Sequence, residues 1–144
     1  DLKLNYITIH ISSGLEALKI AKKFAGKTKL IGVTILTSLN NKSLKEIGFD
    51  KDVKKLVFHQ AKLAAKAKLD GIVCSPHEIK IVRKVFKKEI ITPGIRLRGD
   101  TKGDQKRIMT PKQALKYGAT ALVMGRSLTG NIKKNIQKLI QELN

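Results

Sequence analysis

Thr92-Pro93-Gly94-Ile95-Arg96 is the stretch from which the fold of this 144-residue chain is best deduced. The preceding Ile90-Ile91 is β-branched and suits a buried parallel strand, which the Pro93-Gly94 pair would end sharply. Arg96 then stands where the strand becomes a loop. In a barrel of alternating strands and helices, that edge of the sheet is where ligands bind. We therefore predict that Arg96 contacts a ligand.

A glycine-rich polar loop follows this strand, Gly99-Asp100-Thr101-Lys102-Gly103-Asp104-Gln105-Lys106-Arg107. Gly99 and Gly103 would allow the loop to fold over a bound molecule as a lid. Gln105 offers two donors and an acceptor on one amide group, and Asp104 is expected to orient the loop through local hydrogen bonds. An ordinary solvated surface loop is the alternative interpretation of this stretch taken alone.

The rest of the chain alternates apolar strand-like segments with amphipathic helical segments. Strands are predicted at 5–10, 29–36, 70–75, 90–92 and 120–124, and helices at 15–24, 43–47, 52–68, 76–86, 111–117 (capped by Thr110) and 132–143. Strands without polar alternation indicate a parallel sheet covered by helices. A (β/α)₈ TIM barrel needs about 250 residues, roughly 30 per unit, so this length fits about five units. We predict an α/β fold in which residues 1–144 form one domain, a partial barrel. A doubly wound open sheet is the alternative, but it lacks support because no Gly-x-Gly-x-x-Gly motif follows the first strand.

A second candidate site lies at the end of the last predicted strand, where Gly125-Arg126 follows Met124. A glycine lets backbone N–H groups approach a phosphate closely, and an arginine can hold two phosphate oxygens. The run 127–130 leads into the last helix, whose N-terminus would add a positive dipole. Because barrels often bind phosphate near their last two strands, we predict a phosphate site here, with Arg96 and Gln105 one strand before it.

The remaining polar residues give weaker signals. His10 follows the first strand and is more plausible as a core histidine than as a catalytic one, and Asp70 precedes a strand at the structural end of the barrel. Cys74 is the single cysteine, which excludes an internal disulfide. We find no Ser-His-Asp arrangement and no cluster of metal ligands at useful spacing.

The net charge of +19 raises the question of nucleic acid. Lysine supplies most of the 30 basic residues and is spread over nearly every predicted helix, as on solvated helix faces. Arginine, which forms the specific contacts to base edges, is scarce, and Trp is absent. We expect no specific nucleic-acid binding, although weak adhesion to polyanions at low salt is expected. No apolar run approaches the ~20 residues of a membrane helix, so no membrane partner is expected.

The motifs and their spacing resemble those of orotidine 5′-phosphate decarboxylase of the bacterial type. Five motifs carry the resemblance, in the family's order: Val33-Thr34-Ile35-Leu36-Thr37-Ser38, Asp70-Gly71-Ile72-Val73-Cys74-Ser75, Thr92-Pro93-Gly94-Ile95-Arg96, residues 103–111 and Met124-Gly125-Arg126. The resemblance implies a TIM barrel, of which this chain would form strands 4–8. It also implies decarboxylation of orotidine 5′-monophosphate to uridine 5′-monophosphate in de novo pyrimidine biosynthesis, without cofactor or metal, by a cytoplasmic homodimer.

The resemblance also assigns roles to the residues that match the family's motifs. It implies phosphate binding by Arg126 and the Gly125 backbone, and a Gln105 that reaches between phosphate and pyrimidine. Thr37 and its neighbour Ser38 would lie by the pyrimidine edge, with Arg96 on the phosphate-loop side.

The family's catalytic network of aspartates and lysines has no counterpart that we recognise in this chain. Asp1-Leu2-Lys3 resembles the family's Asp-x-Lys core, but the segment 4–7 that follows departs from the pattern. We therefore expect the catalytic network to lie upstream of Asp1, so that this chain contains no catalytic residue and has negligible activity alone. We also expect that the strand edges at both ends of its sheet are exposed, which favours association. The alternatives are a non-catalytic phosphate- or nucleotide-binding half-barrel and a basic polyanion-binding protein, whose binding would collapse with salt.

Overall fold

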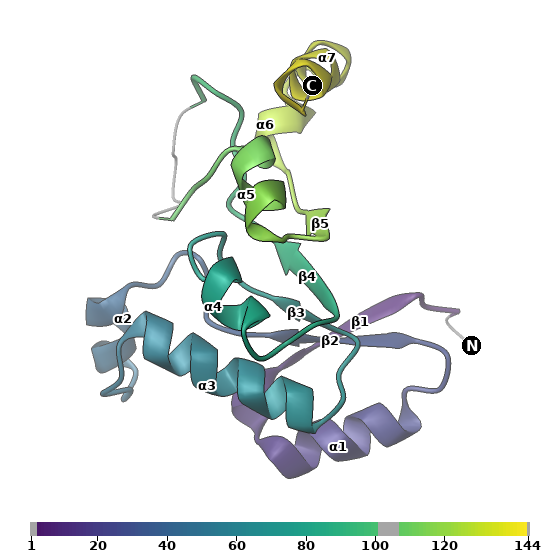
Figure 1. Cartoon of the computed structure of the whole chain (residues 1–144), viewed down its shortest axis with the longest axis vertical. Coiled ribbons are helices and arrows are strands. Elements are labelled where there is room, and N and C mark those ends of the chain that lie inside the picture. The colour runs from purple at the N-terminus through teal and green to yellow at the C-terminus, as the bar shows by residue number, and fades with distance from the viewer. Residues whose placement is uncertain (1–2, 101–106, 144) are drawn as a thin grey trace.

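The computed structural model describes residues 3–100 and 107–143, in which five parallel strands alternate with helices (Figure 1). Asp1, Asp104 and Gln105 lie outside the described residues. The strands pair in chain order, each with the next: β1 (Tyr6–His10), β2 (Lys29–Val33), β3 (Gly71–Val73), β4 (Glu89–Thr92) and β5 (Ala121–Leu122). The predicted α/β class with five consecutive units is confirmed.

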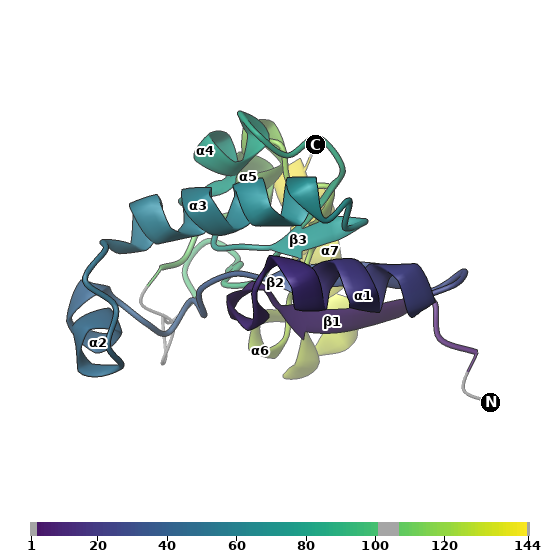
Figure 2. The same ribbon diagram turned by 90° about the horizontal axis from the view of Figure 1, so that it is seen from below.

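The helices are α1 (Leu15–Phe24), α2 (Asn41–Glu46), α3 (Val53–Lys66), α4 (Ile79–Arg83), α5 (Pro111–Tyr117), α6 (Arg126–Thr129) and α7 (Ile132–Leu143), with a 3₁₀ turn η1 (Ile11–Ser13). The helices up to α5 lie between successive strands, and α6 and α7 follow β5. α1, α3, α4 and α5 contact one another in that order and cover the sheet from one side (Figure 1 and Figure 2). Right-handed crossovers between neighbouring parallel strands produce this arrangement. Within the described ranges, no helix is long and apolar enough to cross a bilayer.

Local capping explains where two of the helices begin. The Asp52 carboxylate accepts a hydrogen bond from the Lys55 N–H at 2.9 Å and starts α3. Thr110 occupies the predicted N-cap position of α5, but its side chain makes no capping hydrogen bond in the described chain. Pro111 suits the first position of α5 without such a cap, because proline has no N–H group to satisfy there.

The core lies between the sheet and the helical layer of the first four units. Its fully buried members come from both layers: Ile11, Leu18, Leu44, Val57, Ala61, Ala64, Leu69, Ile72, Ile79, Val82, Ile90, Ile95 and Ala114. The apolar face of α3 is buried at Val53, Leu56, Val57, Ala61 and Ala64, whereas Leu63 is half-buried, and Gln60 is a buried polar residue on this helix. The last unit contributes much less, because β5 has two residues and α7 has no buried side chain.

Both ends of the sheet are open in the described chain. β1 pairs only with β2 and β5 only with β4, which confirms the predicted exposed edges. Tyr6 and Ile7 on β1 are 49% and 46% exposed, and Val123 just after β5 is 50% exposed. The apolar stripe of α7 is exposed as well, at Ile132, Ile136, Ile140 and Leu143. The open edges and the apolar stripe form a surface that further β/α units could cover.

Asp70 ties together the opposite, N-terminal edge of the sheet. Its carboxylate accepts hydrogen bonds from Lys22 Nζ at 2.5 Å and from the Leu30 N–H at 2.9 Å, and Lys88 Nζ lies 3.7 Å away. Burial pushes the pKa of this carboxyl up, but the bonds from Lys22 and Leu30 outweigh burial and hold the pKa below its usual value. These contacts agree with the structural role predicted for Asp70.

Asp70→Asn is expected to lower the free energy of unfolding at neutral pH by about 1–2 kcal/mol, because a partly buried charge pair is lost. The folded-state pKa lies below the unfolded value of 3.8, so the carboxylate's contribution is present above that value and lost as pH falls through the folded pKa. Urea denaturation should therefore show a wild-type advantage that shrinks below about pH 4. An advantage that stays constant down to strongly acidic pH, or an equal loss in the exposed-site control Asp50→Asn, would contradict this role.

Candidate functional site

The candidate site lies at the edge of the sheet where the parallel strands end. Because all five strands run the same way, their C-terminal loops gather at this edge. The loop after β2 carries Thr37, the loop after β3 carries Ser75, and the loop after β4 carries Arg96. Gly125 follows β5, and the Val123 N–H donates to the Thr92 carbonyl at 2.9 Å, which ties the ends of β5 and β4 together.

Thr37 lines a small, mostly apolar pocket between the ends of β2, β3 and β4. The pocket has a volume of about 260 Å³ and is lined by Val33, Ile35, Leu36, Thr37, Ser38, Val73, Cys74 and Pro93. Thr37 is 8% exposed and forms part of the wall of the pocket. Burial, with the nearby Glu78 charge adding to it, raises the pKa of Cys74 to about 12. The thiol therefore stays protonated and is no nucleophile. Apolar walls with a hydroxyl suit a flat, partly polar ring.

Arg96 is buried in the loop after β4 and is held by that loop. It is 8% exposed, and its Nη1 donates to the Ile95 carbonyl at 3.0 Å. Its backbone N–H donates to the Met109 carbonyl at 3.1 Å, and the Met109 N–H donates to Gly94 at 3.2 Å. Gly94 has φ 78°, a conformation that favours glycine, so the strand turns here as the sequence predicted. The segment returning from the polar loop thus fixes the end of β4.

Gly125 and Arg126 are exposed at the end of β5. Gly125 precedes α6, and its carbonyl accepts the Leu128 N–H at 2.8 Å. Residues 127–130 lead into the last helix, which begins at Ile132 as predicted, but Arg126–Thr129 form a separate short helix, α6, that the sequence did not predict. The dipole of the last helix therefore does not begin beside Arg126.

Other predicted residues fall outside this arrangement. Gln105 lies beyond the described residues. His10 is exposed, so its expected place in the core is wrong: it ends the edge strand β1, and no further strand of the described chain pairs there. Within residues 3–100 and 107–143, no group of three His, Cys, Asp or Glu side chains could hold a metal ion.

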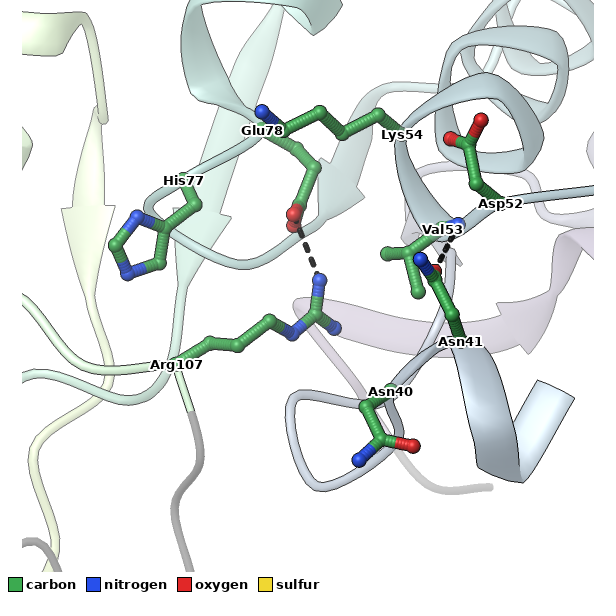
Figure 3. Close-up of a pocket in the computed structure, with 8 residues that line it drawn as sticks. All are labelled: Asn40, Asn41, Asp52, Val53, Lys54, His77, Glu78 and Arg107. Carbon is green, nitrogen blue, oxygen red and sulfur yellow. Dashed lines mark hydrogen bonds and ion pairs between the residues drawn. The ribbon is translucent and has the colours of Figure 1, made fainter.

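An ion pair that the sequence did not predict crosses this edge (Figure 3). Arg107 Nη1 donates to Glu78 Oε1 at 2.7 Å, and Nη2 donates to the Leu36 carbonyl at 2.9 Å. The Glu78 side chain is 2% exposed and that of Arg107 is 14% exposed. Burial raises the pKa of the Glu78 carboxyl, and the Arg107 charge opposes that rise. The only sequence signal was the position of Arg107 within the motif 103–111, which assigned it no role.

The pair also borders a larger open cavity of about 670 Å³, lined by Asn40, Asn41, Asp52, Val53, Lys54, His77, Glu78 and Arg107. In Figure 3, Glu78 and Arg107 point toward each other across one side of this cavity, while Asp52 and Asn41 come from the start of α3 and of α2. The Asn41 side-chain oxygen accepts the Val53 N–H at 3.0 Å, which fixes the opposite wall. None of these residues lines the Thr37 pocket.

Comparison with known proteins gives consistent results. The model of the orotidine 5′-phosphate decarboxylase / HUMPS family matches residues 1–137. A curated orotidine 5′-phosphate decarboxylase of Prochlorococcus marinus (strain AS9601) is 45% identical over 150 residues, covering 94% of this chain and 61% of the relative. The orotidine 5′-phosphate decarboxylase of Coxiella burnetii (strain RSA 331 / Henzerling II) is 44% identical over 137 residues, which cover 90% of this chain and 58% of that relative. The chain thus spans about 60% of the length of these relatives.

Solved structures agree with this fold. The crystal structure of orotidine 5′-phosphate decarboxylase from Lactobacillus acidophilus superimposes with a TM-score of 0.78 at 28% identity, covering 97% of this chain and 63% of that one. The crystal structure of orotidine 5′-monophosphate decarboxylase from Metallosphaera sedula superimposes with a TM-score of 0.66 at 18% identity, covering 96% of this chain and 60% of that one. At this identity the comparison supports the fold alone. The described chain therefore corresponds to a large part of a longer barrel.

Proposed function

Since this chain belongs to the orotidine 5′-phosphate decarboxylase / HUMPS family, as its motifs predicted, we propose that it carries the nucleotide-binding part of a decarboxylase. The whole protein would convert orotidine 5′-monophosphate to uridine 5′-monophosphate in pyrimidine biosynthesis. The observation that carries the proposal is 45% identity, over nearly the whole chain, to a relative named for this activity.

In this proposal the Thr37 pocket receives the pyrimidine ring. Its walls from Leu36, Cys74 and Pro93 are apolar enough to take the faces of a flat ring, and the Thr37 hydroxyl can hydrogen-bond to an edge. Arg96 lies in the same group of loops and adds positive charge on the phosphate side.

The phosphate would bind at Gly125 and Arg126, with Gln105 between phosphate and pyrimidine. Arg126 is exposed at the end of β5, and an arginine there can hold two phosphate oxygens with its planar guanidinium. Apart from its two chain neighbours, no residue in the described part of the chain comes within 4 Å of the place where a Cβ of Gly125 would stand, which leaves room for an anion close to the backbone. Binding energy from the phosphate, far from the reacting carbon, can be used to orient the pyrimidine.

The chemical step would depend on aspartates and lysines in the part of the relatives that this chain does not span. The residues of this chain would bind and orient the nucleotide, and the reaction would need no metal or cofactor. The complete enzyme would be a cytoplasmic homodimer, without nucleic-acid or membrane partners.

Titration of uridine 5′-monophosphate by calorimetry at moderate salt tests this proposal. Arg126→Ala should weaken binding by about tenfold or more, because charge-assisted hydrogen bonds to the phosphate are lost. The matched control is Lys116→Ala, which removes one exposed positive charge from the last turn of α5. Equal losses in both variants, or binding that collapses with salt whatever the base, would indicate general polyanion binding instead.

A further inference from the structure

Arg107 connects three of the loops that form the candidate site. Its Nη2 donates to the Leu36 carbonyl in the loop after β2, and its Nη1 donates to Glu78 in the loop after β3. Its own segment belongs to the loop after β4 and pairs with it, since Met109 bridges to Ile95. One guanidinium therefore sets the relative positions of these loops.

The burial of this pair makes the connection rigid. The Glu78 side chain is 2% exposed, and its backbone N–H donates to the Ser75 carbonyl at 3.0 Å, so the carboxylate has little freedom. A second contact joins the same two loops, since His77 Nε2 lies 3.1 Å from the Ile108 carbonyl oxygen. Removing one partner of a buried charge pair leaves the other without compensation, so such a pair strongly favours one arrangement.

The Leu36 carbonyl that Arg107 holds belongs to the peptide that joins Leu36 to Thr37. A hydrogen bond to this carbonyl restricts the rotation of that peptide, and the peptide sets the direction of the Thr37 side chain. Leu36 and Thr37 both line the small pocket between β2, β3 and β4. A shift of this loop would therefore change the pocket and leave the exposed Gly125 region, which is attached to β5, in place.

We propose that Arg107, anchored by Glu78, is a positioning residue that fixes Thr37 at the base-binding end of the nucleotide site. This inference rests on the proposed function for the identity of the ligand. It assigns no direct ligand contact to Arg107. The Arg107–Glu78 pair governs affinity for the base, while Arg126 governs affinity for the phosphate.

The test uses Arg107→Lys, which keeps the charge but cannot donate to Glu78 and Leu36 in the planar, two-pronged geometry of a guanidinium. Glu78→Gln is the second variant, because it keeps the size of the side chain and removes the charge that anchors Arg107. Arg83→Lys is the matched control. Arg83 also joins loops through carbonyls, donating to Gly118 and to Lys88, but it does so at the other end of α4, and none of these hydrogen bonds reaches a residue that lines the Thr37 pocket.

Two measurements distinguish a role of Arg107 in positioning Thr37 from a role in the stability of the fold alone. The first is the ratio of the affinities for uridine 5′-monophosphate and for ribose 5-phosphate, which lacks the base. We expect Arg107→Lys to lower this ratio by about tenfold while ribose 5-phosphate affinity changes by less than about twofold. The second is the NMR signal of the Thr37 methyl group without ligand, which should shift or broaden in both site variants. The Thr8 and Thr120 methyl signals serve as internal references, and Arg83→Lys should leave all of these readouts as in the wild type.

Each outcome decides the proposal. An unchanged Thr37 methyl signal in Arg107→Lys and Glu78→Gln overturns it, as does an unchanged affinity ratio. If the wild-type chain binds neither ligand, the proposed function fails for this chain, and the Thr37 methyl signal alone still decides whether Arg107 positions that residue.

Discussion

Decarboxylation of orotidine 5′-monophosphate is expected when this chain is mixed with the N-terminal segment of a family relative, and not from either piece alone. The segment used would be the part of the Prochlorococcus marinus relative that precedes the region matched here. The physical reason is that β1 and β5 present unpaired edges in the described chain, and docked β/α units would satisfy them and bury the apolar stripe of α7. Because enzymes accelerate reactions by at least about a millionfold, turnover in the mixture should exceed that of either piece by about a thousandfold even if few complexes form.

A spectrophotometric assay of substrate loss measures this effect. The control mixture contains Arg126→Ala and should lose most of the activity at low substrate concentration, because phosphate binding is weakened. Turnover by the purified chain alone would contradict our view that the catalytic network lies outside it. A mixture that forms a stable complex but remains inactive would contradict the proposed division of roles between the two segments.

Ile72→Ala is expected to destabilise the fold by about 3–4 kcal/mol, a large part of the stability of a domain of this size. Ile72 lies at the centre of β3, paired with Gly32 on β2 and Ile90 on β4, and is fully buried. Truncation to alanine removes buried apolar contacts and leaves a cavity that the neighbouring strands cannot fill without leaving their register.

Urea denaturation followed by circular dichroism measures this loss, and Ile132→Ala is its control. Ile132 is 59% exposed on α7, so the same truncation there should change the free energy of unfolding by no more than about 0.5 kcal/mol. Equal effects at the two sites would show that the described core does not control stability.

The order and type of the main strands and helices could be predicted because local sequence determines them, but the short η1 and α6 and the strand lengths could not. The predicted strand 29–36 ends at Val33, because its partner β3 ends at Val73. The predicted strand 120–124 contracts to Ala121–Leu122, since only Ile91 and Thr92 pair with it. Strand length depends on the neighbouring strand, and a single segment of sequence carries no information about that neighbour.

Some residues of the candidate site could likewise be placed from local sequence, and others could not. The position of Thr37, Arg96 and Gly125 at one edge of the sheet could be predicted because each follows a predicted strand, and the C-terminal ends of parallel strands lie at one edge. The Glu78–Arg107 pair joins residues 29 positions apart, and no local pattern indicates such a contact. His10 was assigned wrongly because its burial depends on what lies beside β1, which its own sequence does not specify.

The central claim is that Thr37, Arg96 and Gly125 belong to one nucleotide site in this chain. Backbone amide NMR during titration of uridine 5′-monophosphate tests it most directly. We predict that the largest shifts occur together at these three residues and saturate with one affinity. Shifts spread over the lysine-rich faces of α1 and α3, without a common saturation at the ends of the strands, would contradict the claim.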